Sequence, residues 1–106
     1  MTLHRHLLRA SLLVPLLAPP LAAQDGNVKM GQQIAAEYCS ACHAIDPGGA
    51  FKQDPPSFAA IAVYRSPEQI RQRIVTPIHA DMPRYSEYMI GGNIDDMVAY
   101  IASLEE

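Results

Sequence analysis

The sequence lacks the features that would tie it to several large protein classes. It contains no tryptophan and only two cysteines among 106 residues, so a disulfide-rich scaffold is excluded. No run of about 20 apolar residues occurs, so no membrane-spanning helix is predicted. Basic residues are also few, with eight Lys and Arg against eleven Asp and Glu. No nucleic-acid partner is expected, because phosphate binding needs a basic face.

The first 23 residues have the layout of a secretory signal. Arg5 and Arg9 give a basic start, the apolar run "SLLVPLLAPPLAA" follows, and small residues stand at Ala22 and Ala23. We therefore predict a signal peptide over 1–23, cleaved after Ala23, and an exported, most simply periplasmic, protein without a stable membrane span. The alternative is an uncleaved anchor helix, but its prolines and its short length disfavour it.

Residues 24–106 are long enough for one small domain. They hold six Lys and Arg and eleven Asp and Glu, which makes the mature part acidic, with a formal net charge of −5. A domain of this size buries a limited core and usually needs a staple such as a disulfide or a metal. A Cys39–Cys42 disulfide would close a very small loop and constrain little of the unfolded chain. Another group is therefore expected at the centre of the fold.

Four helical segments and no convincing strand are predicted, so the expected fold class is all-α. The first segment covers residues 28–41. A loop rich in Pro and Gly over residues 46–56 separates it from a short second helix, "SFAAIAVY". The third helix begins at Ser66, with Pro67 in the first helical position and Gln69 completing a capping box.

The last helix has the clearest apolar stripe. Asn93 is predicted as its N-cap, with Asp95 and Asp96 in the first turn, where acidic residues suit the helix dipole. Five apolar side chains share one face: Ile94, Met97, Val98, Ile101 and Leu104. From residue sizes, we expect this helix to cross the first one, with Gly31 allowing a close approach and Tyr100 filling the space beside it.

The motif "CSACH", which runs from Cys39 to His43, carries the chemistry. A redox dithiol is disfavoured because that chemistry typically stands on a βαβ scaffold. Zinc would take Cys39, Cys42, His43 and His79, but adjacent Cys42 and His43 are poorly placed to reach one tetrahedral ion.

Covalent haem attachment is favoured. The two thiols bond to the porphyrin vinyl groups, and His43 then lies under the iron. Export and small size support it, because haem is attached outside the cytoplasmic membrane and supplies the missing core.

The iron of an electron-transfer haem needs a second axial ligand, and a thioether raises the reduction potential. Met30 lies too close to the motif in sequence, and Met97 belongs to the apolar stripe of the last helix. Met82 and Met89 remain. Met82 is preferred because the proline that follows it can fix the local backbone. His79 is a third possibility and would give a bis-histidine haem.

The mature chain resembles a small class I, monohaem c-type cytochrome of the bacterial periplasm. "MGQQIAAEYCSACHAI" is similar to the first helix of that family, "DMPRY" to its axial methionine segment and "DDMVAYIASL" to its closing helix. The resemblance covers residues 28–104. It implies the cytochrome c fold, with three to four helices wrapped around one covalently attached haem c and the N- and C-terminal helices crossing. It also implies thioethers at Cys39 and Cys42 and iron ligation by His43 and Met82.

The family resemblance implies two further details of the site. A backbone carbonyl beside a proline, here Pro55 or Pro56, is expected to accept the ring N–H of the haem histidine. The stretch "YMIGGN" departs from the usual family pattern, which leaves the direction of Met89 open.

The expected pocket wall is apolar and comprises Ile45, Phe58, Ile61, Ile70, Ile74, Val98 and Ile101. Haem propionates could be held by Arg65, Arg84, Tyr64 and Tyr85.

The expected function is one-electron transfer without an enzymatic site. The haem would cycle between Fe(II) and Fe(III), and the partners would be redox proteins such as a dehydrogenase, an oxidase or another cytochrome. The acidic surface predicts a partner with a basic or neutral docking patch. The alternative is a haem-based sensor of small ligands, or an enzyme subunit, in which Met82 leaves the iron to admit a gas or a peroxide.

Overall fold

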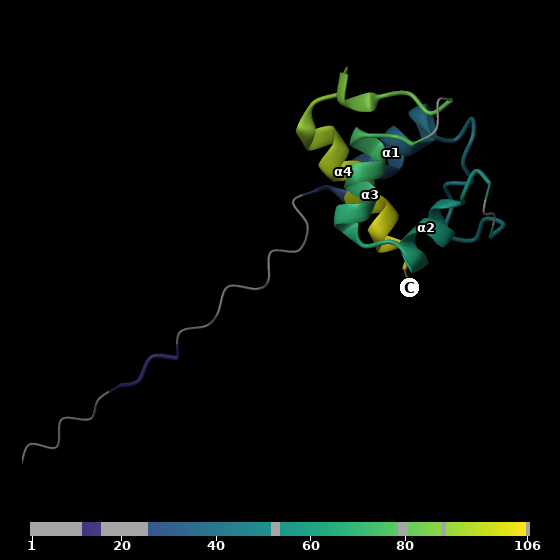
Figure 1. The fold of residues 1–106 in the computed structure, drawn as a ribbon. Coiled ribbons are helices and arrows are strands. Elements are labelled where there is room, and N and C mark those ends of the chain that lie inside the picture. Colours follow the sequence, from purple (N-terminus) through teal and green to yellow (C-terminus); the bar gives the residue numbers. More distant parts are fainter. Residues whose placement is uncertain (1–11, 16–25, 52–53, 79–80, 88, 106) are drawn as a thin grey trace, which may run out of the picture.

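The computed structural model describes residues 12–15, 26–51, 54–78, 81–87 and 89–105. Its helices are α1 (Val28–Tyr38), α2 (Phe58–Tyr64), α3 (Pro67–Val75), the short 3-10 helix η1 (Tyr85–Glu87) and α4 (Gly91–Ser103) (Figure 1). Over these ranges the structure contains no strand element, so the predicted all-α class is confirmed. Most of the predicted signal peptide and His79 lie outside the described residues. No helix within the described ranges is long and apolar enough to cross a bilayer.

Helix α1 begins at Val28, as predicted, directly after its N-cap residue. Asn27 has an extended backbone, and its side-chain oxygen accepts the N–H of Met30 at 2.9 Å. The helix ends at Tyr38 rather than at residue 41, because the chain tightens there into successive turns. Helix α3 follows its sequence signals closely, since Ser66 and Gln69 form the predicted capping box.

The predicted start of the last helix is wrong. Helix α4 begins at Gly91, and Ile90 occupies the N-cap position without a side-chain cap hydrogen bond. Asn93 already lies within the first turn, where its backbone N–H donates to the carbonyl of Ile90 at 3.0 Å. The turn thus forms before Asn93, so its side chain cannot take the capping position.

Two aspartates of α4 bind neighbouring segments, and neither lies in the first turn of the helix, where they were predicted. The carboxylate of Asp96 accepts the backbone N–H of Asn27 at 2.8 Å, which ties the start of α1 to α4. Asp95 forms an ion pair with Arg71 on α3. These contacts fix α4 against the helices on both sides.

The predicted crossing of α1 and α4 is confirmed. A Cβ atom on Gly31 would overlap the carbonyl oxygen of Asp96 and lie 2.7 Å from the Cβ of Tyr100. A Cβ on Gly26 would lie 2.9 Å from the Cβ of Ala99. Glycine at these two positions lets the backbones meet, as α1 and α4 do in Figure 1.

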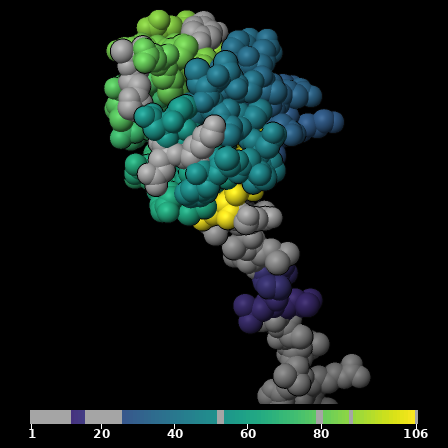
Figure 2. Space-filling model, turned by 90° about the vertical axis from the view of Figure 1, so that its right-hand side faces the viewer, coloured from purple at the N-terminus to yellow at the C-terminus, as the bar shows by residue number. Residues whose placement is uncertain are grey.

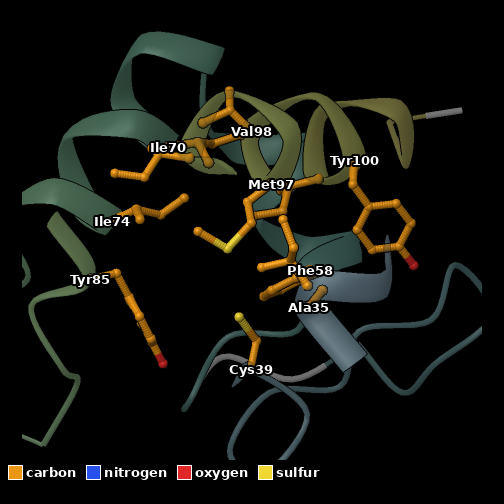
Figure 3. Packing of buried hydrophobic residues seen from close by; sticks show 12 residues of the cluster. Ala35, Cys39, Phe58, Ile70, Ile74, Tyr85, Met97, Val98 and Tyr100 are labelled. Atoms are coloured by element: carbon orange, nitrogen blue, oxygen red, sulfur yellow. The ribbon is translucent and has the colours of Figure 1, made fainter. Parts of the chain in front are cut away.

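The core gathers around α4 (Figure 3). Ile94, Met97, Val98 and Ile101 are buried, and Leu104 packs against them, so the predicted stripe faces inward. All seven residues predicted for the apolar pocket wall belong to this cluster or pack against it. The space-filling view shows the segment with α1 and the following turn, in blue, beside the green segment that includes η1 (Figure 2). These segments carry the candidate site.

Candidate functional site

The Cys39–His43 segment forms a tight turn directly after α1. The backbone N–H groups of Cys42 and His43 both donate to the carbonyl of Cys39, at 3.2 and 2.9 Å. Neither cysteine is in a disulfide. Cys39 is buried and Cys42 is exposed. Burial, together with the neighbouring Cys42, raises the pKa of the Cys39 thiol to about 11. A redox dithiol needs the opposite shift, toward the thiolate, so the structure disfavours that alternative.

The imidazole of His43 is oriented by a backbone carbonyl. Its Nδ1 lies 2.7 Å from the carbonyl oxygen of Pro56. A carbonyl can only accept, so Nδ1 carries a proton, and in the neutral ring the lone pair is then on Nε2. The ring also packs on Phe58, with a centroid distance of 5.5 Å. Of the two prolines considered from the sequence, it is Pro56 that supplies the acceptor.

The chain after His43 is fastened to two helices. The N–H of Phe58 donates to the carbonyl of Ala44 at 2.9 Å, and the hydroxyl of Tyr100 on α4 donates to the carbonyl of Ile45 at 2.7 Å. Burial, and then the nearby Asp46, raise the pKa of Tyr100, so its hydroxyl stays protonated as a donor. Sequence reasoning gave Tyr100 a space-filling role and missed this hydrogen bond.

The methionines separate into three groups. Met30 is 45% exposed on α1, and Met97 is 2% exposed within α4. Both positions agree with those expected from the sequence. Met82 and Met89 are both half-buried and pack against the core cluster. Both therefore remain candidates for a thioether ligand.

Tyr85 has a different position from the one considered for it in the sequence. It was grouped with possible partners of haem propionates, but its side chain is only 6% exposed. Its hydroxyl donates to the carbonyl of Tyr38 at 3.0 Å. By contrast Tyr64 is 66% exposed and meets Phe51 edge to face, with a ring centroid distance of 6.0 Å. A three-residue turn has no periodicity, so no sequence pattern indicated the burial of Tyr85.

The donor set favours haem over zinc. Among the residues that the structure describes, no three His, Cys, Asp or Glu side chains come together as a metal site. His79, the fourth ligand of the zinc alternative, lies outside the described ranges, so this finding concerns Cys39, Cys42 and His43 alone. A covalently attached haem fits the residues present: two free cysteines within one turn, an imidazole with Nε2 available, and an apolar cluster flanked by two methionines. In Figure 3 the sulfur of Cys39 points into that cluster, toward the side on which Met97 lies.

Comparison with family models identifies the protein family. Residues 26–101 match the family described as "Cytochrome C oxidase, cbb3-type, subunit III". The protein belongs to this cytochrome c family. No curated protein and no solved structure matches the cytochrome. It is a monohaem c-type cytochrome that binds haem c covalently, and Cys39, Cys42 and His43 fit the attachment motif.

Family membership also gives the general activity and setting of this cytochrome. A cytochrome c domain transfers electrons through its haem and works with redox partners. Cytochromes of the cbb3 type are exported, with the haem outside the cytoplasm. The fold class predicted from the sequence is therefore confirmed at the level of the cytochrome c fold.

Proposed function

We propose that this cytochrome is a periplasmic one-electron carrier with His/Met ligation. Cys39 and Cys42 would hold the haem through thioethers, and His43 and Met82 would ligate its iron. The observation that carries the proposal is the 2.7 Å hydrogen bond between His43 Nδ1 and the Pro56 carbonyl. It places a proton on Nδ1, so the neutral ring presents Nε2 to a metal, as second-sphere partners of ligating histidines commonly arrange.

The haem, when bound, supplies a centre that gains and loses one electron. His43 stays in one orientation because the Pro56 carbonyl accepts from its Nδ1 and Phe58 packs against its ring. Met82 supplies a soft thioether, which raises the reduction potential and keeps other ligands out. Electron transfer is easier with both ligands held in place, because the protein around the haem then rearranges little when the electron is gained or lost.

The apolar cluster excludes water from the site. Phe58, Ile70, Ile74, Val98 and Ile101 are each at most 6% exposed. A dry environment disfavours the more highly charged centre, so these side chains favour the reduced state. Ile45 and Ile61 extend the same lining with partly buried side chains.

Export requires the leader that the sequence predicts. We propose that residues 1–23 are removed as a signal peptide and that the mature cytochrome begins at Gln24. The basic start and apolar run support this reading. N-terminal sequencing of the exported protein tests it, and retention of Met1 through Ala23 would contradict it.

A role within an enzyme complex is the second candidate. The matching family is described as an oxidase subunit, so this cytochrome could deliver electrons within a larger oxidase rather than shuttle freely. A free carrier elutes as a monomer from the native periplasmic fraction. A subunit co-purifies with catalytic chains of the oxidase.

The visible spectrum tests the proposed function. The protein is expressed with the haem-attachment machinery, extracted with acidified acetone, and separately examined in native form in both redox states. We expect colour that stays with the protein, sharper bands on reduction, and no rapid change on adding carbon monoxide. A spectrum that carbon monoxide shifts at once in the unaltered protein would contradict the closed, six-coordinate carrier and favour a ligand sensor.

Salt dependence tests the expected docking. The mature chain is acidic, so electrostatic steering should favour a partner with a basic patch. We expect the rate of electron transfer to the physiological partner to fall as ionic strength rises. A rate that does not change with salt would remove charge steering from the account.

A further inference from the structure

Tyr85 links the two segments that carry the proposed haem ligands. Its hydroxyl donates to the carbonyl of Tyr38 at 3.0 Å, and this bond joins positions 47 residues apart. Tyr38 immediately precedes Cys39, and Met82 lies in the segment just before η1. One side chain therefore connects the attachment turn to the methionine segment.

The acceptor of this bond is a helix-terminal carbonyl. Tyr38 is the last residue of α1, and the final carbonyls of a helix have no partner within it. The hydroxyl of Tyr85 supplies a donor to that group. The two rings also meet edge to face, with centroids 6.5 Å apart and an interplanar angle of 73°, a favourable geometry for aromatic pairs.

The short helix η1 is held from a second side as well. The N–H of Met89 donates to the carbonyl of Tyr85 at 2.7 Å, which closes the turn around it. The hydroxyl of Ser86 donates to the carbonyl of Val75 at the end of α3, at 3.2 Å. Tyr85 thus fixes η1 to α1, and Ser86 fixes it to α3.

Tyr85 and Met82 lie close together in the sequence. Three residues span at most about 10 Å even when fully extended, and Pro83 restricts the backbone between them. Met82 already packs against the core cluster. Any movement of its side chain away from the site is therefore limited by how firmly Tyr85 is held.

We propose that Tyr85 is a positioning residue that holds the Met82 segment closed against the haem-attachment turn. Its hydroxyl would keep the Met82 segment beside the attachment turn for a larger fraction of the time. The inference rests on the proposed ligation by Met82. Phenylalanine at this position keeps the ring and removes only the hydroxyl, so Y85F tests the hydroxyl, which donates to Tyr38.

The experiment measures carbon monoxide binding to the reduced, haem-loaded protein. If detachment of Met82 limits binding, losing one hydrogen bond should raise the binding rate in Y85F about fivefold, within a range of roughly two- to twelvefold. Y100F is the matched control, because it also removes a buried tyrosine hydroxyl that donates to a backbone carbonyl. Thermal unfolding of both variants shows whether they lose comparable stability.

Three variants and the unaltered protein give distinguishable patterns. The proposal predicts rapid binding in M82A, accelerated binding in Y85F, and the slow rate of the unaltered protein in Y100F. If M82A binds rapidly but Y85F behaves like the unaltered protein, Tyr85 does not position the segment and the proposed function stands. If Y100F accelerates binding as much as Y85F, general destabilisation explains the effect and the inference is overturned. If M82A binds no faster, both the ligation by Met82 and the inference fail.

Discussion

The two sides of this cytochrome are built by different means. On one side α1 and α4 cross with backbone against backbone, at Gly26 and Gly31, and a hydrogen bond from Asn27 to Asp96 locks the register. On the other side, the attachment turn and the methionine segment are irregular chain. Single hydrogen bonds from a side chain to a distant backbone carbonyl hold them at intervals.

This difference indicates where the fold depends on its cofactor. The backbone N–H and C=O groups of a helix form hydrogen bonds within it, so α1 and α4 need only complementary surfaces to pack together. Irregular chain depends on distant partners, and its apolar side chains need something to cover them. We infer that the crossing persists without haem and that the site side requires it. The predictions below test this contrast, from the largest expected effect to the smallest.

Removing the haem anchors should produce the largest effect. In C39A/C42A, the free energy of unfolding should fall by about 5 kcal/mol, a large share of what a small domain has. Amide hydrogen exchange should remain slowest in peptides from α1 and α4 and become fast in residues 44–51 and 81–87. Equal loss of protection on both sides would contradict the contrast.

A methyl group at the crossing should have the next largest effect. In G31A the new Cβ would overlap the Asp96 carbonyl oxygen, so the helices must separate. We expect a loss of about 3 kcal/mol in denaturant unfolding. G48A is the control, because a Cβ there meets nothing within 4 Å. If G31A is as stable as G48A, the close approach of the backbones is not essential.

The hydroxyl of Tyr100 connects the two sides and should have a smaller effect. Y100F loses the bond to Ile45, and its unfolding free energy should fall by about 1 kcal/mol near neutral pH.

The same variant has a pH signature. The pKa of Tyr100 is raised in the folded protein, so its stabilisation is complete below the unfolded value of 10.0. It is lost as pH rises through the folded pKa. Stability should therefore drop more steeply above pH 10 in the unaltered protein than in Y100F. Parallel curves would show that Tyr100 does not titrate in this environment.

The ion pair between Arg71 and Asp95 should have the smallest effect. Their side chains are 42% and 30% exposed, so solvent and salt screen the pair. R71Q should lose about 0.5 kcal/mol at low salt and almost nothing at high salt. R73Q, on the same helix, is the control. An R71Q loss that persists at high salt would point to packing rather than charge.

The sequence predicted features whose signals lie close together along the chain. The capping box of α3 depends on Ser66 and Gln69, three residues apart, and it forms as expected. The stripe of α4 depends on helical periodicity, and it faces the core. The start of α4 was misplaced because Asn93 is a strong capping residue, yet the preceding glycines already adopt helical geometry.

The site was predicted less completely because its contacts join distant segments. Residue type and spacing identified the Cys-x-x-Cys-His turn. They could not separate Pro55 from Pro56, because the acceptor depends on the path of the loop. They also could not show that Tyr85 is buried against α1, since that contact spans 47 positions. Burial alone leaves both Met82 and Met89 beside the core.

Proton NMR of the reduced protein tests the central claim most directly, which is ligation of the haem iron by Met82. The ring current of a haem shifts the methyl group of an axial methionine strongly upfield, away from every other methyl resonance. We predict one such resonance in the unaltered protein, retained in M89A and absent in M82A. A resonance that survives in M82A and disappears in M89A would contradict the account and identify Met89 as the ligand.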